Sequence, residues 1–161
     1  MKKLIFIIAL CLSATFCEQA IAQVTFKVNI STQPIWGPVG YDHVEYYYLP
    51  EIDSYYYVPE HKYIYLEGGR WITRTNLPQL YSHYDMYNSR KVVINDQKPY
   101  LRDKEYKTKY TVSNERSNQQ SIRDSHDSKY FVNKNHPEHS KWKESQKNQG
   151  NQKHDDGRKN N

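Results

Sequence analysis

The feature of this sequence that most restricts its fold is the crowding of tyrosine into one central segment. Thirteen of the 16 tyrosines lie between residues 41 and 100, and six of them occur in two copies of one short pattern, Tyr46–Glu51 and Tyr55–Glu60. Aromatic side chains favour pleated strands, and a following proline ends a strand because it has no amide proton for the ladder. The repeat therefore predicts two strands, each closed by a Pro-Glu turn.

A β-hairpin is expected next along the chain. Gly68 and Gly69 separate two short runs of aromatic and β-branched residues. A Gly-Gly pair supplies the positive φ angles that a two-residue hairpin turn requires. On the expected register, the aliphatic residues share one face and the other residues share the opposite face: Ile64, Leu66 and Ile72 against Tyr63, Tyr65, Trp71 and Thr73.

The predicted fold class is mostly β: a small antiparallel meander of about four to six strands with one short helical turn, plus a disordered C-terminal tail. Alternating apolar residues predict a first strand from Val24 to Ile30. The loop that follows is anchored by Ile35 and Trp36. Leu77–Tyr81 predicts the helical turn, with proline near its start. Further strands are expected at residues 43–49, 52–58, 62–67, 70–75 and 91–95.

The N-terminus has the three parts of a secretory signal peptide. Lys2 and Lys3 precede an apolar run, residues 4–12, and a small-x-small site ends at Ala22. The run is shorter than the roughly 20 residues that a membrane span requires. We therefore expect cleavage between Ala22 and Gln23, export to the periplasm or beyond the cell, and no transmembrane span after processing.

Composition divides the chain into a signal peptide (1–22), a tyrosine-rich β domain (23–101) and a polar, basic tail (102–161). The β domain has 7 basic and 8 acidic side chains, whereas the tail has 14 and 9. The tail has few aliphatic residues, so burial cannot offset the entropy of ordering it, and it is predicted to be largely disordered from about Asn114 onward. Because export is expected, a nucleic-acid partner is not.

One group of candidate binding residues is aromatic. An exposed aromatic surface could stack against sugar rings. The alternative is cross-strand pairing that only holds a small sheet together, and it is favoured because consecutive tyrosines point to both faces. The candidate residues are Tyr47, Tyr55, Tyr57, Tyr63, Tyr65 and Trp71.

A second candidate is the sequence His-Pro-Glu-His, in which His136 and His139 could hold a divalent metal ion. The alternatives are a polar turn in a flexible tail and a short element that docks a partner. The turn is favoured because mobile ligands lose entropy when they bind a metal. No cofactor is expected.

The sequence lacks the common catalytic motifs, including the GxSxG elbow and the glycine-rich phosphate loop. Both cysteines, Cys11 and Cys17, lie in the predicted leader, so the mature chain has no thiol. We therefore expect a non-enzymatic, envelope-associated binding or structural module. The alternatives are a binder of carbohydrate or peptidoglycan through the aromatic face, a small secreted hydrolase and a tail-centred metal binder. Expected partners are an envelope glycan or another envelope protein, and a second copy of the chain, in a homo-oligomer, is a further candidate.

Several motifs support a family resemblance. They are Trp36-Gly37-Pro38 with Gly40-Tyr41, the Tyr46–Pro50 element and Tyr65–Trp71, and the similarity reaches the tail at Ser121–Ser125 and Asn135–His139. On these residues the chain resembles an uncharacterised family of small exported proteins found mostly in Bacteroidota-type bacteria. The resemblance implies an envelope or secreted location and carries no catalytic residue over to this chain.

Overall fold

The computed structural model describes residues 28–110 and 118–156, with side chains up to residue 149. The predicted signal peptide, its cleavage site and most of the predicted first strand lie outside these ranges. The last residue of that strand, Ile30, instead begins a 3-10 helix, Ile30–Thr32, so the described end of this segment is not a strand. Within the described ranges, no helix combines the length and the apolar character that a membrane crossing needs.

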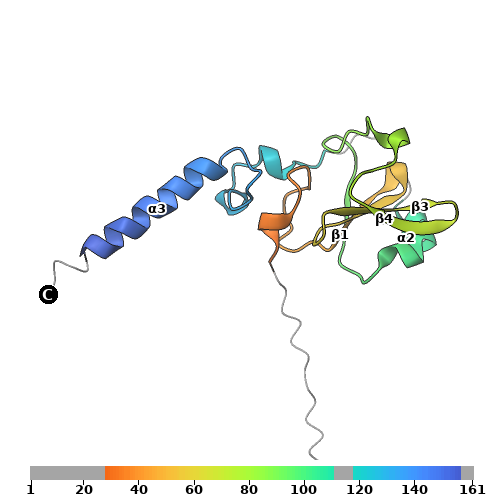
Figure 1. Cartoon of the computed structure of the whole chain (residues 1–161), viewed down its shortest axis with the longest axis horizontal. Coiled ribbons are helices and arrows are strands. Elements are labelled where there is room, and N and C mark those ends of the chain that lie inside the picture. Colours follow the sequence, from red (N-terminus) through yellow and green to blue (C-terminus); the bar gives the residue numbers. More distant parts are fainter. Residues whose placement is uncertain (1–27, 111–117, 157–161) are drawn as a thin grey trace, which may run out of the picture.

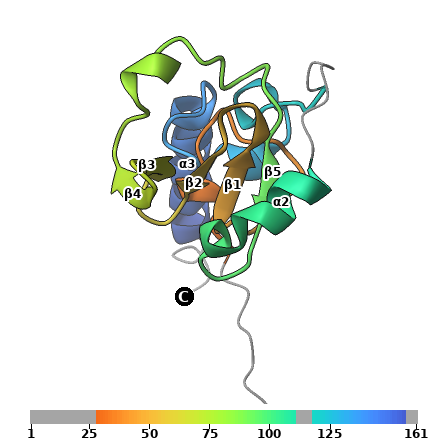
Figure 2. The same cartoon turned by 90° about the vertical axis from the view of Figure 1, so that its right-hand side faces the viewer.

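Five antiparallel strands form one sheet (Figure 1), and Figure 2 labels them in their order β4-β3-β2-β1-β5. The first four form a meander, and the fifth returns to pair beside β1. This arrangement confirms the mostly β prediction, and a 3-10 helix at Gln79–Tyr81 confirms the predicted helical turn. The strands are β1 (Tyr46–Leu49), β2 (Ser54–Tyr57), β3 (Lys62–Glu67), β4 (Arg70–Arg74) and β5 (Val92–Ile94).

The two tyrosine triplets pair with each other across β1 and β2. The opposed pairs are Tyr46 with Tyr57, Tyr47 with Tyr56, and Tyr48 with Tyr55. Side chains alternate along a strand, so the middle pair faces one side of the sheet and the two outer pairs face the other. In each outer pair the ring centroids are 4.8 Å apart. The repeat is therefore a cross-strand aromatic ladder.

The Gly68-Gly69 hairpin forms as predicted, with φ angles of +55° and +75°, but the predicted division of its faces was wrong. The two-residue turn pairs Glu67 with Arg70, which places Leu66 opposite Trp71. Directly opposed residues share a face. The two sides of the hairpin are therefore Ile64, Leu66, Trp71 and Thr73 against Tyr63, Tyr65, Ile72 and Arg74.

Both faces of the sheet are covered (Figure 2). Helix α2 (Asp103–Lys109) lies on one face, where Tyr106 packs among the outer tyrosines of β1 and β2. The segment 29–44 lies on the other face, where Trp36 packs against Tyr47 and Tyr56. Aromatic rings therefore form the core on both sides of the sheet.

An ionic network fastens α2 to the sheet. Tyr55 Oη donates to Asp103 at 3.0 Å, and Tyr48 Oη donates to Asp53 at 3.3 Å. Lys107 Nζ lies 2.5 Å from Asp53 and 2.8 Å from Asp103, so it joins the two carboxylates. Burial, together with these carboxylates, raises the pKa of both tyrosines far above the ordinary value. Both phenols therefore stay protonated as hydrogen-bond donors.

The largest departure from the sequence prediction is the segment 118–138, which we call the strap. Composition predicted disorder there, but the strap folds back onto segment 29–44 (Figure 1). Ile122 N donates to Gly37 O at 2.8 Å, and Arg123 N donates to Ile35 O at 2.8 Å. Ile122 and Tyr130 also form a small apolar cluster with Ile30. The prediction of disorder was therefore wrong for the strap.

The strap is held largely by polar groups, which composition alone does not distinguish from those of a solvated tail. Asn133 is only 1% exposed. Its Nδ2 donates to Gln33 O at 2.6 Å and to Ile30 O at 3.3 Å, and its Oδ1 accepts from Asn135 N at 3.1 Å. After the strap, helix α3 (His139–Asp156) leads away from the sheet (Figure 1).

Replacing Asn133 with alanine is expected to loosen the strap. The buried carbonyls of Gln33 and Ile30 would lose their donor, so the free energy of unfolding should fall by about 2–3 kcal/mol in urea titration. The matched control is Asn135→Ala. That residue is exposed and bonds Asn133 through its backbone, so its effect should stay within about 0.5 kcal/mol. Equal losses in the two variants would contradict this role of Asn133.

Candidate functional site

The six aromatic residues predicted as a binding surface do not lie on one face. Tyr55, Tyr57 and Trp71 lie on the side of α2, whereas Tyr47, Tyr63 and Tyr65 lie on the side of segment 29–44. Tyr47 and Tyr55 are fully buried. The ring contacts of Tyr55, including one to Trp71 at 5.8 Å, are core packing. These six residues therefore do not form a continuous exposed platform.

The two candidate metal ligands, His136 and His139, bond to backbone groups instead. His136 is buried, its Nε2 donates to Ser125 O at 3.2 Å, and its Nδ1 accepts from Glu138 N at 3.1 Å. His139 Nδ1 donates to Phe131 O at 2.7 Å. Among the described residues, no three His, Cys, Asp or Glu side chains are grouped to hold a metal ion. The two histidines of the His-Pro-Glu-His sequence thus hold backbone groups in place at the end of the strap.

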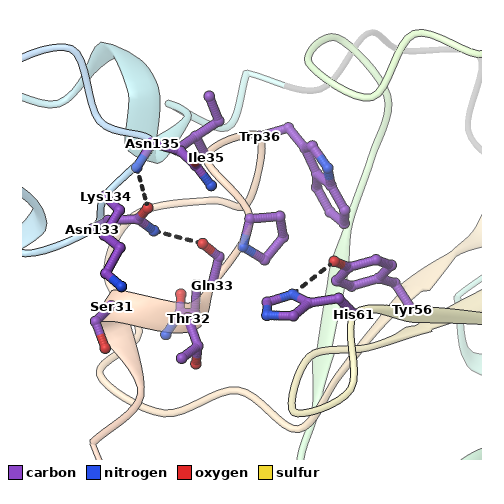
Figure 3. Close-up of a pocket in the computed structure, with 11 residues that line it drawn as sticks. Ser31, Thr32, Gln33, Ile35, Trp36, Tyr56, His61, Asn133, Lys134 and Asn135 are labelled. Atoms are coloured by element: carbon purple, nitrogen blue, oxygen red, sulfur yellow. Dashed lines mark hydrogen bonds between the residues drawn. The ribbon is translucent and has the colours of Figure 1, made fainter. Parts of the chain in front are cut away.

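A pocket of about 450 Å³ lies where three distant parts of the chain meet (Figure 3). These parts are the loop 31–36, the β2 side with its following turn, and the strap at 133–135. The lining residues are Ser31, Thr32, Gln33, Pro34, Ile35, Trp36, Tyr56, His61, Asn133, Lys134 and Asn135. Because the strap supplies one wall, the pocket depends on the segment for which the sequence predicted disorder.

The aromatic wall of the pocket is formed by Trp36 and Tyr56. Their ring centroids are 5.0 Å apart with the planes at 72°, and Trp36 also contacts Tyr47 at 5.3 Å. Gly37 permits this arrangement, because a Cβ there would lie 2.5 Å from Tyr47 Oη. Two ring contacts and a close backbone approach therefore fix the orientation of the indole.

His61 adds a third ring from the turn between β2 and β3. Its φ of +54° is left-handed, and its imidazole Nδ1 lies 3.1 Å from Tyr56 Oη. Burial and the nearby Tyr63 raise the pKa of Tyr56 to about 12, so this phenol is protonated at neutral pH. The other ring nitrogen of His61 faces the loop 31–34 across the pocket (Figure 3). When the phenol of Tyr56 donates to Nδ1, the neutral imidazole carries its proton on the other nitrogen, Nε2, which is then a hydrogen-bond donor.

The opposite wall is polar. The side chain of Asn133 already bonds the carbonyl of Gln33, but the side chains of Lys134 and Asn135 are exposed. The Lys134 side chain extends along the pocket toward Ser31, which is also exposed (Figure 3). The pocket therefore combines a rigid aromatic side with a side of amide, hydroxyl and ammonium groups.

A buried lysine outside the pocket has a structural role. Lys91 is 2% exposed, and its ammonium donates to Met86 O at 2.7 Å and Tyr87 O at 3.2 Å. Burial lowers its pKa to about 8. Gln119 of the strap bonds the backbone N and O of Lys91 at 2.9 and 2.8 Å. Lys91 therefore joins the preceding loop, β5 and the strap.

Comparison of the chain with protein-family models, with curated proteins and with solved structures finds no match.

Proposed function

We propose that this protein is a non-enzymatic, exported, envelope-associated binding module and that its pocket binds a sugar ring of an envelope glycan. The observation that carries the proposal is the indole of Trp36, held beside Tyr56 opposite a wall of amides and hydroxyls. The apolar face of a sugar stacks on such rings, while a few convergent polar groups orient its hydroxyls. Export rests on the N-terminal leader, and the envelope is where an exported binder meets glycans.

The composition of the pocket supports binding in preference to hydrolysis. A glycosidase generally needs two carboxylates about 5–9 Å apart on either side of the scissile bond. None of the described lining residues is Asp or Glu. The donors in the pocket can hold a sugar, but they supply no paired acid and base for cleaving it.

Replacing Trp36 with alanine should weaken binding of a sugar at least about tenfold, because stacking on the fixed indole is lost. The probes are cellotriose, maltotriose and chitotriose, titrated against the mature protein and followed by tryptophan fluorescence and NMR. The matched control is Trp142→Ala, which removes an indole from α3 instead. It should leave the affinity unchanged.

Trp36 also packs on the core, so a second variant separates binding from stability. Ser31→Tyr places a large side chain at an exposed position of the pocket wall without removing a core contact. It should block the three sugars while the unfolding midpoint is retained. Wild-type affinity in both Trp36→Ala and Ser31→Tyr would refute the proposed site.

A further inference from the structure

We infer that the sugar bound in this pocket carries an anionic group, a carboxylate or a phosphate, and that Lys134 is the residue that selects it. This inference rests on the proposed function, because it concerns the ligand of the same pocket.

The charge of the pocket differs from that of the domain around it. Residues 23–101 have 8 acidic and 7 basic side chains. The described lining of the pocket has Lys134 and His61 but no Asp or Glu. Without a carboxylate in the wall, the ammonium has no opposite charge there. An anionic group on the ligand would supply it.

Lys134 also differs from the lysines near it in the chain. Lys129 pairs with Asp42 at 3.1 Å, and Lys141 pairs with Glu138 at 3.2 Å. In the part of the chain that the structure describes, no carboxylate lies within ion-pair distance of Lys134. Its charge is therefore available to a ligand.

The backbone at Lys134 is held on both sides. Asn133 before it is buried and bonds two carbonyls of the opposite segment, and Asn135 after it donates its N–H to Asn133 Oδ1. The lysine thus starts from a fixed position beside the pocket, and less conformational entropy is lost when it meets an anion. An ammonium carried on a fixed backbone opposite a fixed indole favours a ligand that has both a stacking ring and a negative charge.

The test compares one oligosaccharide with its own neutral form. The probes are a glucuronate trisaccharide and the same trisaccharide after reduction of its carboxyl groups. At low salt we expect the wild-type protein to bind the acidic form about fivefold more tightly, and salt should reduce this preference. Lys134→Met should bind the two forms equally, whereas Lys141→Met, with the same loss of charge on α3, should keep the preference.

A second arm compares glucose 6-phosphate with glucose by NMR titration and identifies which anion the pocket prefers. A preference for either anion that disappears in Lys134→Met supports the inference. Equal binding of charged and neutral forms by the wild type overturns it and leaves the sugar site intact, since Trp36→Ala would still weaken binding. If no sugar shifts the resonances of pocket residues, the proposed function itself fails.

Discussion

Above about pH 10, this protein is expected to unfold within about two pH units, because its core is made of tyrosines that must stay protonated. Six buried tyrosines carry this effect. The pKa is raised to about 12 by burial at Tyr46, Tyr56 and Tyr106. It is raised further at the almost completely buried Tyr47, Tyr48 and Tyr55.

The sign follows from the protons that each state holds. As the pH rises from about 10 to 12, the unfolded chain loses these six phenolic protons, while the folded chain keeps most of them. The free energy of unfolding therefore falls by at most about 1.4 kcal/mol per pH unit for each tyrosine, or at most about 8 kcal/mol per pH unit for all six. A small domain has only about 5–15 kcal/mol in total.

The buried Lys91 acts in the opposite direction at lower pH. Burial lowers its folded pKa from the ordinary value of 10.5 to about 8. Between these values, the unfolded chain holds a proton that the folded chain lacks, so the free energy of unfolding rises with pH, by about 3 kcal/mol in total. Six tyrosines outweigh one lysine as soon as the unfolded chain begins to lose phenolic protons, so maximum stability is expected near about pH 9.

Urea titrations at a series of pH values measure these slopes, and phenolate absorbance reports the ionisation directly. The buried phenols should ionise together with the loss of near-ultraviolet circular dichroism. Tyr56→Phe should reduce the downward slope by about 1.4 kcal/mol per pH unit relative to the wild type. Ionisation of the core tyrosines one after another in a protein that remains folded past about pH 12 would contradict the prediction.

Gly37→Ala should lower the free energy of unfolding by about 3 kcal/mol although it adds only one methyl group. The new Cβ would lie 2.5 Å from Tyr47 Oη, 2.9 Å from Tyr47 Cζ and 3.0 Å from Pro34 O. Tyr47 cannot swing aside easily, since it is fully buried and donates to Gln33 Oε1 at 3.0 Å. The strain would fall on the residue next to Trp36, so sugar affinity should fall as well.

A double-mutant cycle tests the origin of this loss. Tyr47→Phe alone should cost about 1–2 kcal/mol, because it leaves Gln33 Oε1 without its donor. In the Tyr47→Phe background the worst contact is gone, so adding Gly37→Ala should cost at least about 1 kcal/mol less than it does in the wild type. Additive losses would show that the clash with the Tyr47 hydroxyl is not the cause.

The sheet could be predicted because its signals are local. The tyrosine triplets, their prolines and the Gly-Gly turn each act within about ten residues of sequence, and all three form as expected. The faces of the hairpin were predicted incorrectly because alternation along each strand does not fix how the two strands align, and the two-residue turn sets that register. With Glu67 opposite Arg70, an even-numbered residue of β3 must share its face with an odd-numbered residue of β4.

The strap and the pocket could not be predicted from composition, because their contacts are polar and distant. Asn133 bonds Gln33 across 100 residues, and Tyr130 Oη accepts from Gly40 N across 90. The sequence alone does not distinguish an asparagine that is buried in the fold from any other asparagine of a polar tail.

The long-range closure by the strap also determines when the pocket is complete during folding. During synthesis the sheet has all its strands once β5 has emerged, but Trp36 then still faces an open side. Only after Asn133 and His136 have emerged can the loop 31–36 be fastened, a late step because contacts distant in sequence form slowly. The pocket is therefore the last part of the fold to form, and a chain in which residues 133–136 are not yet free has a sheet but no complete pocket.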